Sequence, residues 1–278
     1  MIVGLNAASE GFFETRPPYS NEQLLRFVRR ATSLGFEAVQ IGPLRYFDPI
    51  EARQLKIVLD ACKTERNVHV GGIYDAEKFA LTQEEYVKAR NEVRHGIMLC
   101  KRISSTLVSL HAPFFGPENL ATEELQSLAK RRFLELLKEE VNLASRNHVK
   151  IALESFCYPP FIFKGLDDFA QFVSKFPVEK LGVLLDVGHL YQIGIGLSVA
   201  VHAFADRLLD VHVHDATRGK DYRKAHLPVG TGEIDFSSFL NLLREVKYDG
   251  WRTLEVRAGE KEVVQSKEFL ESLLTRRS

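Results

Sequence analysis

The sequence predicts an α/β fold, a single (β/α)8 or TIM barrel formed by residues 1–278. Eight short β-branched or apolar runs alternate with longer helical patterns, which is typical of βα units repeated around a parallel sheet. The length of 278 residues suits this barrel, and no Pro- or Ser-rich linker divides the chain. A doubly wound open sheet is the main alternative, but the first run is followed by GLNAASEGF rather than by the GxGxxG fingerprint of that fold.

The predicted strands and helices alternate along the whole chain. The strands are expected over residues 2–6, 36–42, 68–74, 106–112, 149–155, 181–187, 208–214 and 251–257. Three helices begin with a capping pattern, in which Ser, Asp or Thr is followed three residues later by Gln or Glu: Ser20 with Gln23, Asp48 with Glu51 and Thr82 with Glu85. Further helices are expected over 122–147, 166–176, 197–208, 236–247 and 261–276. Gly35 follows the first helix, where a left-handed residue ends many helices.

Composition excludes several classes of function. Lys plus Arg and Asp plus Glu number 37 each, so the overall charge indicates neither a nucleic-acid nor an anionic-membrane partner. The amino terminus lacks the pattern of a signal peptide and no run is long enough for a membrane span, so we expect a soluble cytoplasmic protein. The three cysteines form no CxxC pair, which predicts reduced thiols rather than a disulfide framework or a zinc ribbon.

Acidic side chains end several predicted strands in the second half of the chain. Glu154 ends the run KIALE, Asp186 ends GVLLD and Glu255 follows RTL. The carboxyl ends of barrel strands meet at one face, where converging carboxylates would repel one another. One acid at a strand end is more often a helix cap or an ion-pair partner, but three together with the histidines of DVHVHD favour a divalent cation. Such a ligand set suits Mn, Mg or Co and does not exclude Zn.

The motifs LLDVGH, VHVHD and HLPVGTGEIDF resemble those of the xylose isomerase-like barrel superfamily. This group contains sugar and sugar phosphate isomerases and epimerases, inosose dehydratases and the endonuclease IV enzymes. The resemblance implies that one divalent metal ion is held by Glu154, Asp186, His212 and Glu255. His212 is the histidine three residues before Asp215, so the neighbouring His214 is expected behind the metal ligands or at the rim.

The resemblance also implies a reaction and a set of substrate contacts. It implies a metal-dependent isomerase or epimerase that acts on a sugar or sugar phosphate through an enediolate, with Glu154 and Glu255 exchanging the proton. His189 and Arg218 stand at the spacings of the substrate-holding residues of ketose epimerases. The histidines His111 and His226 are expected as further substrate contacts. Oligomers are common in the group, which implies a homo-oligomer.

One loop and several single positions bear on the identity of the substrate. The loop after the seventh predicted strand contains five basic side chains: Arg218, Lys220, Arg223, Lys224 and His226. They favour a phosphorylated or acidic sugar, although a solvated loop explains them equally well. Pro160 stands where ketose epimerases carry a second glutamate, which argues against free ketohexoses. Asn6 is expected at the mouth of the barrel, and Gln40 occupies a position that is commonly acidic in relatives.

Three other functions compete with this prediction. An endonuclease IV-like zinc phosphodiesterase acting on abasic DNA needs three zinc ions, and His111 and His226 match two of its additional ligands. However, the third predicted strand begins with His69 instead of ending in a histidine, and Lys224 replaces an expected aspartate, so nucleic acid is not the expected partner. An inosose dehydratase-like lyase is a further alternative. A barrel that only binds its ligand needs no matched pair of bases, whereas this chain retains both candidate proton carriers, Glu154 and Glu255.

Overall fold

The computed structural model is a closed barrel of eight parallel strands in the order β1-β2-β3-β4-β5-β6-β7-β8, which confirms the predicted (β/α)8 fold. It describes residues 2–7, 19–42, 46–71, 75–115, 121–155, 162–219, 221 and 224–275. The strands are β1 (Ile2–Asn6), β2 (Ala38–Ile41), β3 (Glu65–Val70), β4 (Leu107–His111), β5 (Lys150–Glu154), β6 (Leu181–Asp186), β7 (Leu208–Val213) and β8 (Trp251–Leu254). Pairing of β1 with β8, in which Leu5 lies opposite Leu254, closes the barrel.

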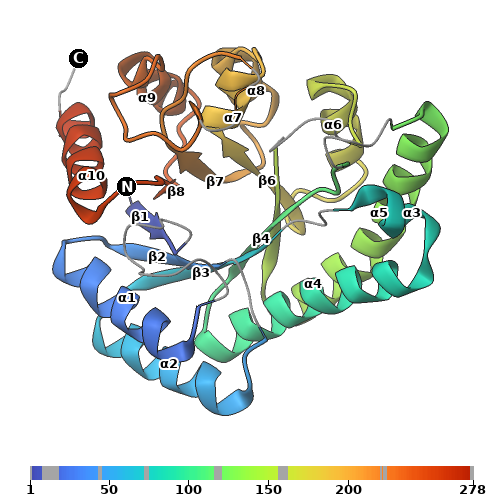
Figure 1. Cartoon of the computed structure of the whole chain (residues 1–278), viewed down its shortest axis with the longest axis horizontal. Helices are drawn as coiled ribbons and strands as arrows, with labels where there is room; N and C mark the ends of the chain where they lie inside the picture. The colour runs from blue at the N-terminus through green and yellow to red at the C-terminus, as the bar shows by residue number, and fades with distance from the viewer. Residues whose placement is uncertain are drawn as a thin grey trace.

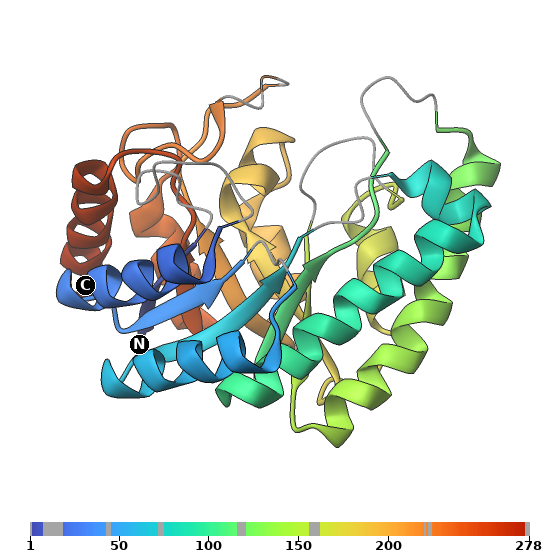
Figure 2. The ribbon, with the colours of Figure 1, turned by 60° about the horizontal axis from the view of Figure 1, so that its bottom comes forward.

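The helices surround the strands (Figure 1). They are α1 (Asn21–Ser33), α2 (Pro49–Ala61), α3 (Ala76–Leu81), α4 (Gln83–Ile103), α5 (Glu123–Arg146), α6 (Leu166–Val173), α7 (Val187–Gln192), α8 (Leu197–Ala203), α9 (Phe236–Glu245) and α10 (Glu260–Thr275). Figure 2 shows α1, α2, α4 and α5 side by side along one side of the barrel. None of the described helices is both long and apolar enough to cross a membrane.

Local sequence signals explain where several helices begin and end. The side chains of Ser20 and Asp48 each accept the backbone N–H of the third residue of the helix, and the Gln or Glu side chain of that residue accepts the backbone N–H of the cap, so both predicted capping boxes form. Thr82 caps α4 through the N–H of Glu85 and also separates α4 from α3, which was not predicted. Gly35 has a φ of 79° after α1, as expected of a residue that follows a helix end.

The predicted boundaries of β3 are wrong in a way that affects the site. The strand covers Glu65–Val70 rather than 68–74, because its polar first half pairs with β2 from Ala38↔Glu65 onward. His69 therefore lies next to the carboxyl end of β3 and not at its start. The error arose because the polar stretch Glu-Arg-Asn does not resemble a strand. A barrel strand can nevertheless contain polar residues when their buried groups find hydrogen-bond partners.

Candidate active site

The acidic residues that the sequence predicts as ligands lie together at the carboxyl ends of adjacent strands. Glu154 ends β5, Asp186 ends β6, His212 is the residue before the end of β7, and Glu255 follows β8 directly. Asp186 and His212 are register partners between β6 and β7. Glu154, Asp186 and His212 are buried, and the side chain of Glu255 is 12% exposed. The barrel topology therefore brings residues that span about a hundred positions of the sequence into one cluster.

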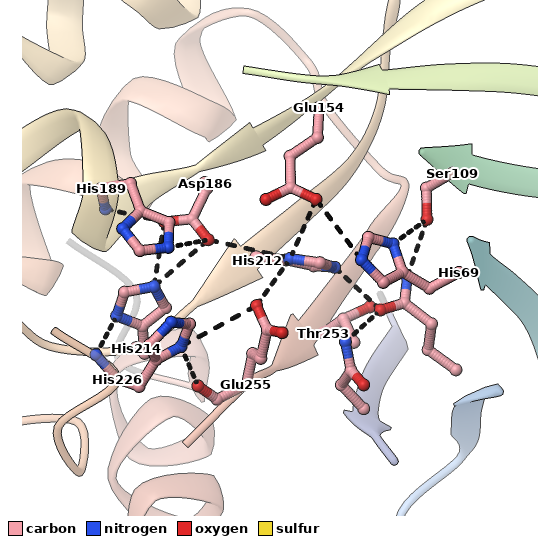
Figure 3. A network of polar contacts seen from close by, with 12 residues as sticks. His69, Ser109, Glu154, Asp186, His189, His212, His214, His226, Thr253 and Glu255 are labelled. Atoms are coloured by element: carbon pink, nitrogen blue, oxygen red, sulfur yellow. Dashed lines mark hydrogen bonds and ion pairs between the residues drawn. The ribbon is translucent and has the colours of Figure 1, made fainter. Parts of the chain in front are cut away.

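The ring nitrogen Nδ1 of His212 is the centre of this cluster (Figure 3). It lies 2.9 Å from Glu255 Oε2, 3.8 Å from Glu154 Oε2 and 3.8 Å from Asp186 Oδ2. Among the described residues, neither this nitrogen nor Glu154 Oε2 has a neighbour aligned for a hydrogen bond, although both atoms are buried. Neighbouring ligands of one divalent ion lie roughly 3–3.5 Å apart. Three carboxylates and an imidazole nitrogen that converge in this way, displacing the ring proton when a metal binds, fit a divalent cation.

Burial and the neighbouring charges shift the pKa values of this cluster strongly. Burial lowers the pKa of His212, but the carboxylates of Glu255 and Glu154 outweigh it and raise the pKa to about 10. Burial raises the pKa of the Glu255 carboxyl, but His212 outweighs this and holds it well below its usual range. For Glu154 burial is dominant, so its pKa is raised. The two glutamates therefore differ in proton affinity before any cation is added.

A pair of histidines lies on the other side of Glu154. His111, the last residue of β4, places Nε2 2.8 Å from Glu154 Oε2. His69 places Nε2 3.7 Å from the same oxygen, and its Nδ1 lies 2.8 Å from Ser109 Oγ. His69, Glu154 and His212 each offer one atom to a second group with metal-ligand spacing. The sequence-based exclusion of a histidine at the end of the third strand is thus overturned, because the strand ends at Val70.

His214 lies directly behind Asp186 and is fully buried. Its Nδ1 accepts the backbone N–H of His226 at 2.8 Å, so its Nε2 carries the proton and donates to Asp186 Oδ1 at 2.9 Å. This arrangement requires Gly188, because a Cβ there would lie 1.9 Å from Cε1 of His214. His189, His214 and His226 also have metal-ligand spacing, but both ring nitrogens of His214 already have partners.

The other two predicted substrate-binding histidines line the same region. His189 is the third residue of α7 and donates its backbone N–H to the capping residue Asp186 at Oδ1 over 2.7 Å, and its Nε2 lies 3.9 Å from Asp186 Oδ2. His226 stacks on His214 with ring centres 4.2 Å apart, and its Nδ1 lies 3.0 Å from the carbonyl oxygen of Glu255. Burial lowers the pKa of His189 to about 4 and that of His226 well below its usual value. Both imidazoles are therefore neutral at pH 7.

The loop after β7 is organised by one buried carboxylate. Asp215 accepts the backbone N–H groups of Ala216, Gly230, Gly232 and Ile234 at 2.8–3.1 Å. These N–H groups are consequently not directed at a ligand. Gly232 is required there, because a Cβ would lie 2.4 Å from Asp215 Oδ1.

The basic residues of the loop are not gathered at the cluster. Arg218 is exposed, and its guanidinium lies 5.1 Å from the centre of the Tyr191 ring. Lys224 is exposed as well. The positions Cys157, Pro160, Lys220 and Arg223 lie outside the described residues. Of the five predicted basic residues, Arg218 and Lys224 are therefore exposed in the described part of the chain, and His226 is buried beside His214.

Comparison with known proteins identifies the family. The model of the family described as "Xylose isomerase-like TIM barrel" matches residues 28–273. The chain belongs to this family. The match confirms the resemblance noted in the strand-end motifs.

Relatives in this family include proteins named as sugar isomerases and epimerases. The uncharacterized protein MJ1311 of Methanocaldococcus jannaschii is 25% identical over 273 residues, covering 91% of this chain and 85% of its own. The L-ribulose-5-phosphate 3-epimerase UlaE of Escherichia coli O1:K1 is 23% identical, covering 88% and 86%. An inosose isomerase of Halalkalibacterium halodurans is 26% identical over 164 residues, 56% of this chain and 57% of the relative.

Solved structures of the family share the fold over the whole chain. A D-tagatose 3-epimerase-like protein superimposes with a TM-score of 0.79 at 22% identity, covering 99% of this chain and 97% of the other. D-psicose 3-epimerase from Clostridium cellulolyticum H10, solved with D-tagatose, gives 0.77 at 15% identity and covers 99% of both chains. The IolI protein with a bound zinc atom gives 0.74 at 16% identity, covering 99% and 96%. At these identities the likeness establishes the fold.

Asn6, which was expected at the mouth of the barrel, and Gln40 lie directly against the candidate metal cluster. Asn6 and Gln40 are fully buried, and Gln40 Oε1 lies 2.8 Å from His212 Nε2. Asp210, which the sequence analysis did not select, is buried beside them and contacts Gln40 Nε2 at 3.2 Å. Its signal was present in the sequence, because Asp210 and His212 are two residues apart on a strand and share one face.

Proposed function

We propose that this protein is a divalent-metal-dependent isomerase or epimerase that acts on a sugar or sugar phosphate by proton transfer through an enediolate. One observation carries the proposal. Nδ1 of His212 is buried, has no aligned hydrogen-bond partner among the described residues, and is surrounded by the carboxylates of Glu154, Asp186 and Glu255. Family membership and the epimerases and isomerase among the relatives support the same class of reaction.

The four residues of this cluster would hold the metal. When bound, a divalent ion would polarise the substrate carbonyl and acidify the neighbouring C–H bond. Figure 3 shows Glu154 and Glu255 on opposite sides of His212, which supports their reaching opposite faces of a substrate. The raised pKa of Glu154 suits a base that must hold a proton between two steps, because proton transfer is efficient when the pKa lies close to the working pH.

The neighbouring histidines would orient the substrate. Burial keeps His189 and His226 neutral, so neither adds a fixed positive charge. His189 can donate one hydrogen bond to a substrate oxygen, whereas His226 donates its Nδ1–H to the Glu255 carbonyl and offers Nε2 as an acceptor for a substrate hydroxyl. His111 would contact the substrate from the β4 side, next to Glu154. Arg218 at the rim would meet the outer, more polar end of the sugar. The loop amides held by Asp215 offer no backbone cradle for a phosphate, so the guanidinium is the candidate contact for such a group.

Hydrogen exchange tests the proposal directly. The protein would be incubated in D2O with Mn2+ and a panel of ketoses and ketose phosphates, and deuterium at the carbon next to the carbonyl would be followed by NMR. We expect incorporation with at least one substrate, and a loss of about 10²–10⁴-fold in Glu154→Gln and Glu255→Gln. Glu233→Gln is the matched control, because Glu233 accepts the N–H of Arg218 outside the metal cluster. No exchange with any member of the panel contradicts the proposal.

The placement of His69 favours one second candidate, a zinc phosphodiesterase acting on abasic DNA. With His69 at the end of β3, the cluster around Glu154 contains two histidines that a second zinc ion could use. Lys224 replaces an aspartate expected in that zinc group, and the zero net charge does not favour a polyanionic substrate. Metal analysis separates the two candidates: we expect one tightly bound divalent ion per chain that is lost in Asp186→Ala and His212→Ala. About three zinc ions together with cleavage of abasic duplex DNA would establish the phosphodiesterase instead.

A further inference from the structure

A layer of buried polar side chains lies inside the barrel beneath the proposed metal centre. It comes from six strands and consists of Asn6, Gln40, Asn67, Ser109, Asp210 and Thr253, all with no measurable exposure. Polar groups buried this deeply destabilise a fold unless each finds hydrogen-bond partners, so their directions of donation are constrained. Those directions determine which nitrogen of His212 carries its proton.

Asp210 sets the direction because its hydrogen-bond partners among the described residues are all donors. Its carboxylate accepts the N–H of Val211 at 2.8 Å, the amide of Asn67 at 3.0 Å and the hydroxyl of Thr253 at 2.9 Å. The fourth donor is Gln40 Nε2, at 3.2 Å. Among the described residues, no cationic side chain forms an ion pair with Asp210. The carboxylate is thus held by neutral donors only, which requires every group that faces it to point a hydrogen toward it.

Gln40 transmits this constraint to His212. Since its amide nitrogen must face Asp210, its amide oxygen faces the opposite way, toward Asn6 Nδ2 and His212 Nε2. The reversed amide would place an oxygen against the Asp210 carboxylate and an NH2 group against the NH2 group of Asn6. The oxygen therefore accepts Nε2–H of His212 at 2.8 Å, and in the neutral ring Nδ1 keeps its lone pair.

We propose that Gln40, oriented by Asp210, is a positioning residue that keeps the proton of His212 on Nε2 and thereby presents Nδ1 to the metal. The inference rests on the proposed metal-dependent function. Outer partners of this kind fix the tautomer and the ring orientation of a ligating histidine and increase its basicity, and their loss weakens metal binding about 10–100-fold. Asp210 is inferred to act through Gln40, since in the described part of the chain it shares a hydrogen bond with Gln40 and none with His212.

The test measures metal affinity rather than turnover. Full-length protein stripped of metal would be titrated with Mn2+ and Zn2+ in competition with a chromogenic chelator. Gln40→Met removes the acceptor of Nε2–H, and Asp210→Asn is isosteric and lets the Gln40 amide turn around. We expect each variant to bind both metals about 10–100-fold more weakly than the unchanged protein. Thr253→Val is the matched control, because it removes one donor to Asp210 but leaves the contact between Gln40 and His212 in place.

A double-mutant cycle tests whether Asp210 acts through Gln40. If it does, the variant carrying both Gln40→Met and Asp210→Asn binds metal about as weakly as Gln40→Met alone, because the second change has no remaining hydrogen-bonded route to His212. Additive losses would overturn the relay, as would unchanged affinity in the single variants. If circular dichroism shows that Gln40→Met does not fold, Asp210→Asn alone serves as the test. Unchanged metal affinity in this isosteric variant would by itself overturn the relay. If the unchanged protein binds no divalent metal, both the proposed function and this inference fail.

Discussion

Replacing Gly188 by alanine isolates the contact between His214 and Asp186. Gly188 is the second residue of α7, and a Cβ there would lie 1.9 Å from Cε1 and 2.1 Å from Nδ1 of His214. His214 is fully buried and stacked on His226, so its ring has no space into which it can move by the distance of about 1 Å that normal contacts demand. We expect Gly188→Ala to displace His214 from Asp186.

Three contributions determine how far Gly188→Ala lowers the free energy of unfolding. Forcing a methyl group into a packed interior costs about 1–3 kcal/mol, and losing the hydrogen bond from His214 to a carboxylate costs about 1.5–3 kcal/mol. Alanine is favoured over glycine inside a helix by about 1 kcal/mol, which offsets part of this. The free energy of unfolding should therefore fall by about 2–5 kcal/mol, although a Gly→Ala change in a helix ordinarily stabilises.

Urea unfolding of the metal-free protein, followed by circular dichroism, measures this difference. Gly165→Ala is the matched control, because a Cβ at Gly165 meets no atom within 4 Å, and we expect it to change the free energy of unfolding by less than about 0.5 kcal/mol. Equal stability of Gly188→Ala and Gly165→Ala would refute the reasoning, because His214 would then have no fixed position behind Asp186.

Three further predictions concern the loop, the buried histidines and the metal. Asp215→Asn halves the acceptor capacity for four backbone N–H groups, so limited proteolysis should cut the segment 216–235 faster while circular dichroism stays unchanged; unchanged cleavage would contradict this. Burial lowers the pKa of His189 to about 4, so between pH 6.5 and 4 this imidazole is protonated in the unfolded chain but stays neutral in the folded chain. The free energy of unfolding therefore decreases as the pH falls through this range. The loss attributable to this group reaches up to about 3 kcal/mol, and His189→Gln should show a correspondingly weaker decrease between pH 7 and 5 in urea unfolding. Mn2+ at about 100 times its Kd should stabilise the fold by about 2.7 kcal/mol, and calorimetry should find this increase abolished by EDTA or by Asp186→Asn.

The register of the strands decided which sequence predictions succeeded. Glu154, Asp186 and Glu255 could be selected because each follows an apolar run, and strand ends of a parallel barrel meet at one face whatever the details of packing. His69 was misplaced because the position of a residue along a strand depends on where pairing with β2 begins, and Glu65 pairs although it is charged. Because the predicted start of β3 was three residues too late, the sequence analysis did not place His69 next to Glu154.

Periodicity and strand-end chemistry in the sequence determined the fold class, the family resemblance and the convergence of acids on one end of the barrel. Only the tertiary structure decided the roles of the inward-facing polar residues. Asn6 ends β1 and Gln40 nearly ends β2, but the hydrogen bonds that bury both side chains come from other strands and could not be inferred from their own segments. The partner of His212 Nε2 is 172 residues away in sequence, and hydrogen-bond direction is a property of the closed network rather than of any segment. That network, not the spacing of HVH, determines which nitrogen of His212 faces the carboxylates.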